Sequence, residues 1–240
     1  MAQATLGDRI NIAGSTIGAF ERGIRTPSRE YSVTLDEFLS TGGALTLLWD
    51  EISELRDIPE DWRTFEKAER QAIAIRQFHA TLFPGLLQTQ DYAHAVLKNT
   101  GVWTRDQVER LSAARASRLQ GLGDIAYTFV VDEIVLRRAH GSWDILRAQL
   151  DHVRGLLDDY GVRLLVIPND TLFHPNLAGS FRLLSMRDGR LIGQEEYVSG
   201  TNVVTGPKVE QLVTMFGHLQ GEAMSLQDST QLLEKIRREL

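Results

Sequence analysis

The sequence predicts an α+β protein, with a mainly helical N-terminal half and a C-terminal mixed α/β domain that contains a small sheet. Helical spacing of apolar residues dominates as far as about Gly123, and β-rich segments alternate with helical ones from Asp124 onward. The run Arg187-Asp188-Gly189-Arg190 stands between two apolar segments, which is typical of a β-hairpin. A composition of 42% hydrophobic and 24% charged residues is that of an ordinary globular chain and excludes a disordered or collagen-like one.

The first forty residues predict three helices. Residues 6–23 have the pattern of a short helix, a tight turn at Asn11 and a second short helix. A third helix follows Ser28, because the apolar residues after it recur on one helical face. The glycines of Thr41-Gly42-Gly43 then break the pattern. We therefore expect one domain over residues 1–43 and a second over residues 44–240.

The second domain is predicted to begin with a helical part over residues 44–123. Pro84-Gly85 is its clearest interruption, and Thr89 follows as the cap of another helix. The pair Thr104 and Gln107 has the spacing of a capping box and opens a helix that directs Leu111 inward.

Residues 124–240 are predicted to form the α/β part of the second domain. Short β-rich runs bounded by turn residues indicate strands, and apolar residues at helical spacing indicate helices between them. The predicted elements are strands at 125–131 and 162–167, a helix through Leu146 to Gly161, a hairpin of 181–186 with 191–198, and helices from Pro207 and from about Ser225.

Composition excludes several functional classes. The chain has 26 Lys and Arg against 32 Asp and Glu, a net charge of −6, so any nucleic-acid surface must be local. The absence of cysteine excludes disulfides, thiolate zinc sites and a thiol nucleophile. The six histidines have no metal-ligand spacing, and the common nucleotide-binding and serine-hydrolase motifs are missing. We therefore expect no metal and no cofactor.

The sequence carries no apolar run that approaches the about 18 residues needed to cross a bilayer. Its first residues also lack the basic and apolar regions of a signal peptide. We therefore expect a cytoplasmic protein without a membrane partner.

The segment Ser15-Thr16-Ile17-x-x-Phe20-Glu21-Arg22-Gly23-x-Arg25-x-Pro27-Ser28 resembles the end of the recognition helix in XRE-type helix-turn-helix regulators. The resemblance implies that Ser15, Thr16, Arg22 and Arg25 contact phosphates and bases of DNA. The alternative is a helix cap followed by solvated arginines.

A more specific resemblance covers most of the chain. The segment Ala68-Glu69-Arg70-Gln71-Ala72-Ile73-Ala74-Ile75-Arg76, followed by Pro84-Gly85-Leu86-Leu87-Gln88-Thr89-Gln90-Asp91-Tyr92-Ala93, resembles the large C-terminal domain of antitoxin-like regulators of the WhiJ kind. Further matches are Val131-Asp132-Glu133, Leu136-Arg137-Arg138 and Glu196-Tyr197-Val198. The resemblance implies a transcriptional regulator that pairs with a small partner protein encoded nearby.

Two departures from that family affect the N-terminal module. A full helix normally precedes the helix at Leu6, so residues 1–43 look like a truncated helix-turn-helix module. The exposed positions of the recognition helix are expected at Ala13, Gly14, Gly18 and Ala19, which cannot donate hydrogen bonds to base edges. Because the charges of residues 1–43 also sum to −1, we expect only weak binding to duplex DNA.

The candidate site of the second domain combines carboxylates with arginines. Glu133 with Arg137 and Arg138 forms either a site for an acidic ligand or a set of structural ion pairs. The second group is Glu195-Glu196-Tyr197, in which alternation along a strand places Glu196 opposite to Tyr197.

If Glu133 and Glu196 converge, one of these carboxylates becomes a candidate general base. His174 is the remaining catalytic candidate, although its place in a His-Pro-Asn segment favours a role in a turn over catalysis. We expect a concave pocket with the most perturbed ionisable groups between about residues 127 and 202.

Two functions remain open. The first is a regulator that binds a small partner protein and, weakly and as a homodimer, duplex DNA. The second is a relative that no longer reads DNA and whose C-terminal domain binds a small molecule or catalyses a reaction on one.

Overall fold

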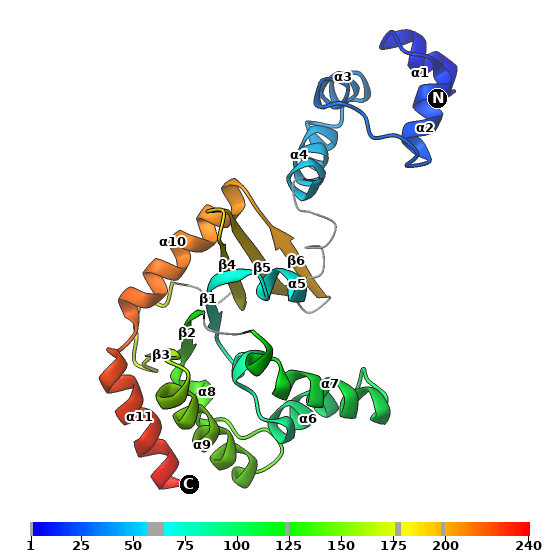
Figure 1. Ribbon diagram of the computed structural model, residues 1–240. Coiled ribbons are helices and arrows are strands. Elements are labelled where there is room, and N and C mark those ends of the chain that lie inside the picture. The colour runs from blue at the N-terminus through cyan, green and yellow to red at the C-terminus, as the bar shows by residue number, and fades with distance from the viewer. Residues whose placement is uncertain (1, 57–64, 123–124, 176–178, 198–199) are drawn as a thin grey trace. The chain divides into compact units, whose positions relative to one another are not determined.

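The computed structural model describes residues 2–56, 65–122, 125–175, 179–197 and 200–240 (Figure 1). Helices account for 54% of the chain and strands for 18%, which confirms the predicted α+β class. The chain divides into two compact units, Met1–Pro59 and Glu60–Leu240. Each unit is described separately below.

Within residues 2–56, the N-terminal unit contains the helices α1 (Gln3–Arg9), α2 (Gly14–Glu21), α3 (Arg29–Leu39) and α4 (Ala44–Arg56). The predicted turn between the first two helices is confirmed, because Asn11 has a positive φ of 59° there. The predicted cap of α3 is confirmed as well, since the Ser28 hydroxyl accepts a hydrogen bond from the Tyr31 amide. Ile10, Ile17 and Leu35 form the small core of this unit.

Three glycines allow α1 and α2 to approach closely, because they have no Cβ atom. A Cβ atom on Gly7 would lie 2.4 Å from the Ile12 carbonyl oxygen, and one on Gly14 would lie 2.8 Å from the Cα of Ala4. A Cβ atom on Gly18 would lie 2.8 Å from Oε1 of Gln3. Gly14 and Gly18 therefore face α1, so the expectation that they are exposed reading positions is wrong.

The turn at Gly42-Gly43 joins α3 to α4. The Asp36 carboxylate accepts hydrogen bonds from the backbone amides of Leu45 and Thr46 and from the hydroxyls of Thr41 and Thr46. Burial alone would raise the pKa of Asp36, but these hydrogen bonds hold it far below its usual range. The boundary predicted after residue 43 therefore falls inside the first compact unit, because Asp36 ties the two helices together across it.

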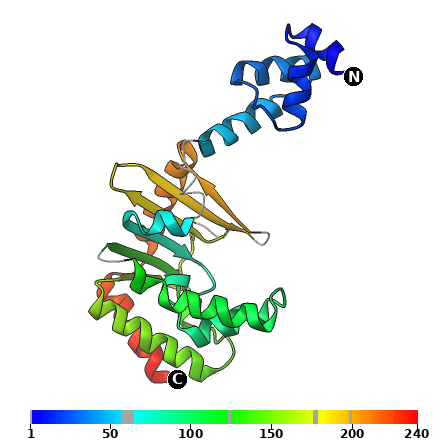
Figure 2. The same ribbon diagram turned by 45° about the vertical axis from the view of Figure 1, so that its right-hand side comes forward.

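The second unit contains a six-stranded sheet in the order β3-β2-β1-β4-β5-β6. The strands β1, β2 and β3 run parallel to one another, and β4, β5 and β6 continue the sheet in antiparallel fashion. Figure 2 shows β4 and β5 side by side, and the hairpin predicted between them is confirmed. The strands are β1 (Ala72–His79), β2 (Ala126–Asp132), β3 (Arg163–Ile167), β4 (Phe181–Met186), β5 (Leu191–Tyr197) and β6 (Gly200–Val204).

The central strand β1 corrects the prediction that residues 44–123 are helical throughout. Ile75 and Phe78 of β1 are fully buried on opposite faces of the sheet. The neighbours of β1 are β2 and β4, which come about 50 and 110 residues later in the chain. Pairing on both sides with strands so distant in sequence overrides the local preference for helix.

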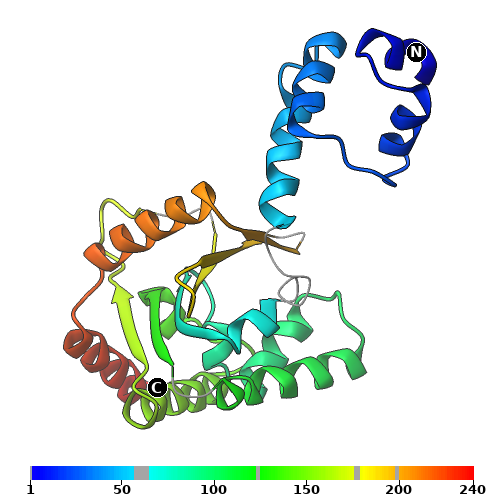
Figure 3. The same ribbon diagram turned by 45° about the horizontal axis from the view of Figure 1, so that its top comes forward.

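Helices cover both faces of the sheet (Figure 3). On one face, α10 (Pro207–Glu222) packs Phe216 and Leu219 against Phe78 and Leu183. On the other face, Leu146 and further residues of the helical layer enclose a larger core. The helices that contribute to this core are α5 (Phe65–Glu69), α6 (Gln90–Asn99), α8 (Glu133–Arg137), α9 (Trp143–Asp159) and α11 (Leu226–Glu239). The helix α7 (Arg105–Ser117) packs against α6.

Local signals at helix ends are largely confirmed. The Thr89 hydroxyl caps α6, and Thr104 and Gln107 form the predicted capping box of α7. The inward orientation predicted for Leu111 is wrong, because this side chain is 37% exposed.

None of the helices that the structure describes is long and apolar enough to cross a membrane.

Candidate functional site

Polar side chains gather where the parallel strands end. We call this border of the sheet its carboxyl edge. The parallel strands β1, β2 and β3 end at this edge with His79, Asp132 and Ile167. Because β4 runs antiparallel to β1, it begins there with Phe181, and Glu195 of β5 pairs with Phe181. Ligands of open α/β sheets generally bind beyond this carboxyl edge.

A buried carboxylate lies at the centre of the site. Glu69, the last residue of α5, is fully buried, and Arg118 Nη2 lies 2.6 Å from its Oε2 atom. Arg182 on β4 forms an ion pair with the other carboxylate oxygen, and its guanidinium also lies over the Phe65 ring. Burial lowers the pKa of Arg182, while the Glu69 charge opposes this change.

A second group of side chains surrounds Arg182. Gln77 lies directly opposite Arg182 in the β1–β4 pairing, and its Nε2 atom is 2.6 Å from Nε2 of His79. That ring nitrogen is also 3.8 Å from the Glu196 carboxylate. Burial, with the charges of Arg182 and Arg115, lowers the pKa of His79 to about 3. The imidazole is therefore neutral at physiological pH and acts here as a hydrogen-bond acceptor.

Arg115 on α7 is the last member of this group of side chains. Its Nη1 atom donates a hydrogen bond of 3.3 Å to Oε1 of Gln88, whose own amide donates to the Phe83 carbonyl. Burial lowers the pKa of Arg115, and the Glu196 charge opposes this effect. We use the name buried polar cluster for the set Glu69, Gln77, His79, Gln88, Arg115, Arg118, Arg182 and Glu196.

Two atoms of the buried polar cluster lack a hydrogen-bond partner in the described part of the chain. They are Oε1 of Gln77, an acceptor, and Nε of Arg182, a donor. Gln77 is fully buried and the Arg182 side chain is only 5% exposed. A buried polar atom without a partner costs free energy, so each of these two atoms favours a further hydrogen-bond partner, such as a water molecule.

His174, a predicted catalytic candidate, lies at the same sheet edge but outside the buried polar cluster. Its Nε2 atom is 2.7 Å from Oδ1 of Asp132 at the end of β2, and its ring packs near Phe78. Burial raises the pKa of Asp132, while the hydrogen bond from His174 opposes that rise. The contact fixes the segment after β3 across the end of β2.

Glu133 and Glu196 do not converge. Glu133 begins α8, where it accepts hydrogen bonds from Arg137 and from the Asn169 amide. Glu196 lies on β5, three strand positions from β2, which corresponds to about 14 Å. The condition set for a general base, that Glu133 and Glu196 converge, is therefore not met, because two strands separate them.

The remaining candidates in the second unit lie at separate places. Arg137 pairs with Glu133 and approaches Glu239, whereas Arg138 is exposed. The Tyr197 hydroxyl donates a 2.7 Å hydrogen bond to Glu195, which raises the pKa of Tyr197. A cavity of 260 Å³ between β5 and α10 is lined by both of these residues and by Glu196.

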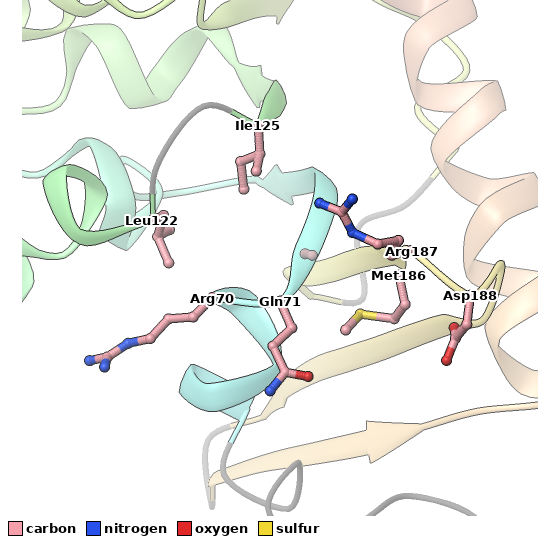
Figure 4. Close-up of a pocket in the computed structure, with 8 residues that line it drawn as sticks. Arg70, Gln71, Leu122, Ile125, Met186, Arg187 and Asp188 are labelled. Carbon is pink, nitrogen blue, oxygen red and sulfur yellow. The ribbon is translucent and has the colours of Figure 1, made fainter.

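The 260 Å³ cavity lies in the region expected to hold a pocket. The histidine with the large pKa shift, His79, is on β1 and therefore outside that region. A larger cavity of 710 Å³ opens at the opposite edge of the sheet, beside Ala72 and Met186 (Figure 4). Figure 4 shows the Arg70 side chain pointing away from Arg187 and Asp188.

The predicted DNA-contacting residues are on the surface of the N-terminal unit. Ser15, Arg22 and Arg25 are exposed, and Thr16 is half-buried. A Cβ atom on Gly18 would lie 3.0 Å from Nη1 of Arg22, so this guanidinium lies along α2.

Sequence reasoning missed most of the buried polar cluster. Glu69 and Arg182 are 113 residues apart, and Glu69 and Arg118 are 49 apart. One local signal was available, because Arg182 stands between Phe181 and Leu183 in a strand whose other residues are mostly buried. A charged residue at such a position needs a buried partner of opposite charge.

The fold and the site define a domain in which a mixed sheet covered by helices on both faces contains a buried ionic cluster. No group of three or more acidic or histidine side chains in the described residues could hold a metal ion. Residues 62–235 match DUF5753, a domain of unknown function, and the chain therefore belongs to the DUF5753 family. No curated protein and no solved structure matches the sequence.

Proposed function

We propose that the protein is a cytoplasmic transcriptional regulator of the antitoxin-like WhiJ kind. In this proposal the helices α1 and α2 form an XRE-type helix-turn-helix pair that contacts duplex DNA as part of a homodimer. The DUF5753 domain binds a small partner protein encoded nearby. Support comes from the motifs that resemble this regulator family.

The observation that carries the proposal is the arrangement of α2. Its glycines face α1, while Ser15, Arg22 and Arg25 are exposed around the same short helix and the turn after it. Hydroxyl and guanidinium groups are the donors that proteins use on phosphates and base edges. The helix therefore keeps the hydrogen-bond donors that a DNA contact needs.

The affinity of this contact is expected to be low. Acidic residues outnumber basic ones in the chain, and Gln3 and Glu21 are already hydrogen-bonded to each other beside α2. We expect a dissociation constant in the range of about 10⁻⁴–10⁻⁶ M at physiological salt, which is typical of non-specific binding.

Fluorescence anisotropy with a labelled random-sequence duplex tests this proposal. Removing both arginines in Arg22→Ala/Arg25→Ala should weaken binding and reduce the slope of log K against log salt by about 0.9 for each phosphate that is no longer neutralised. The charge-matched control Arg110→Ala/Arg163→Ala removes two exposed arginines of the second unit and should bind as the wild type does. Equal affinities and equal salt slopes for the two double variants would contradict the proposal.

The partner protein is tested by co-expression. The product of a small adjacent gene, purified with the full chain, should form a complex of defined stoichiometry in analytical ultracentrifugation. If the neighbouring genes instead encode biosynthetic enzymes and no complex forms, the second function, small-molecule binding by the C-terminal domain, is favoured. The unpartnered atoms of Gln77 and Arg182 are the observation that supports this second function.

A further inference from the structure

The 260 Å³ cavity between β5 and α10 lies beside a close contact of these two elements. A Cβ atom on Gly193 of β5 would lie 2.8 Å from Cδ1 of Leu212 on α10, so only a glycine allows the helix to approach there. Glu195 lies two positions further along β5, on the same face of the strand. It lines the cavity together with Leu212 and Met215. The cavity therefore opens directly next to a tightly packed part of the unit.

One wall of the cavity is apolar. Phe181, which pairs with Glu195 across β4 and β5, is only 3% exposed and packs in the same core as Phe216. Leu212 and Met215 of α10 pack against that core as well. The volume of 260 Å³ is smaller than the about 300–1,000 Å³ of pockets for drug-sized ligands, so the cavity fits a small apolar group such as a phenyl ring.

Glu195 supplies the negative charge that faces this cavity. Alternation along β5 turns Glu196 to the opposite face, where its carboxylate lies 3.8 Å from His79. The Glu195 carboxylate accepts a hydrogen bond from the Tyr197 hydroxyl through Oε2, and no Lys, Arg or His among the described residues pairs with it. None of the described residues that line the cavity is basic. The cavity therefore offers a negative charge without a positive partner.

These features match an ammonium group attached to an apolar body. An ammonium group carries three N–H donors, for which Oε1 of Glu195 and the Tyr197 hydroxyl oxygen are acceptors. The aromatic rings of Tyr197 and Phe181 also attract cations. An anionic ligand would be repelled by Glu195, and a neutral ligand would leave this charge unpaired.

We propose that the cavity between β5 and α10 binds a small primary amine with an apolar body. The ammonium group pairs with Glu195 beside the Tyr197 hydroxyl, and the apolar body lies against Phe181, Leu212 and Met215. The proposal concerns the second unit alone, so it does not depend on DNA binding or on a partner protein.

Isothermal titration calorimetry of the full chain at pH 7 and constant ionic strength tests the ligand class. The probe is phenethylamine, and each of three matched compounds changes one feature of it. Methylamine lacks the apolar body, phenethyl alcohol lacks the charge, and hydrocinnamate reverses the charge. Phenethylamine should bind saturably, and each of the other three compounds should bind at least about 10-fold more weakly.

Two variants locate the binding. Glu195→Gln keeps the size of the side chain but removes its charge, so it should weaken binding of phenethylamine by about 10- to 100-fold. Glu210→Gln removes an exposed charge of α10 that does not line the cavity, and it should leave the affinity unchanged. The proposal is overturned if phenethylamine does not bind, if any of the three matched compounds binds equally well, or if the two variants have the same affinity.

Discussion

Glu69 is expected to be the most sensitive single position for the stability of the second unit. Its carboxylate is fully buried between Arg118 and Arg182, whose side chains are 25% and 5% exposed. The substitution Glu69→Gln keeps the shape of the side chain but removes the negative charge that both guanidiniums contact.

Removing one partner of a buried ion pair costs about 3–5 kcal/mol. Because Arg118 reaches solvent, we expect the lower end of this range, about 3 kcal/mol. For a unit of this size, that loss lowers the Tm by about 6–12 °C. Differential scanning calorimetry measures it, with Glu109→Gln as a control, since the Glu109 carboxylate is 65% exposed and should change stability by less than about 0.5 kcal/mol.

A double variant tests the physical cause. Replacing both charged partners in Glu69→Leu/Arg182→Met removes the unpaired buried charge, so it should recover much of the stability lost in Glu69→Gln. If the double variant is less stable than either single substitution, or if Glu69→Gln unfolds with the wild-type Tm, the interpretation of this ion pair is refuted.

Three further predictions concern pH and packing. The pKa of His79 falls from 6.5 to about 3 on folding, so the neutral form stabilises the folded state above pH 6.5. As the pH falls from 6.5 to 3, this group should lower the free energy of unfolding by about 1.4 kcal/mol per pH unit. Urea titrations at several pH values should show that the free energy of unfolding of His79→Gln changes less with pH than that of the wild type. Gly7→Ala should destabilise the N-terminal unit by at least about 1 kcal/mol, because the new methyl group meets a backbone oxygen. Gly155→Ala in α9, where the new methyl group meets no described atom within 4 Å, should instead stabilise the protein by about 0.5–1 kcal/mol in the same denaturation assay.

The elements that could be predicted from the sequence are those with local signals. The helix α9 follows from its regular apolar spacing, and the β4–β5 hairpin follows from Asp188-Gly189 between two apolar runs. The caps at Thr89 and Thr104 also depend only on nearby residues. Such elements are specified within a few residues of chain.

The parts that could not be predicted depend on distant contacts. The strand β1 forms because β2 and β4 pair with its two sides, and neither neighbour is close in sequence. The same holds for Glu69, whose charge is tolerated only because Arg118 and Arg182 arrive from other elements. The structure places Glu133 and His174 at the end of β2, and their sequence positions alone do not place them relative to Glu196.

The most direct test of the proposed function is hydrogen–deuterium exchange of the full chain with and without a saturating DNA duplex at low salt. The proposal predicts slower exchange in residues 14–25, which contain α2 and the two exposed arginines after it. Unchanged exchange in residues 14–25, with protection confined to residues 65–240, would contradict the assignment of DNA contact to the N-terminal unit.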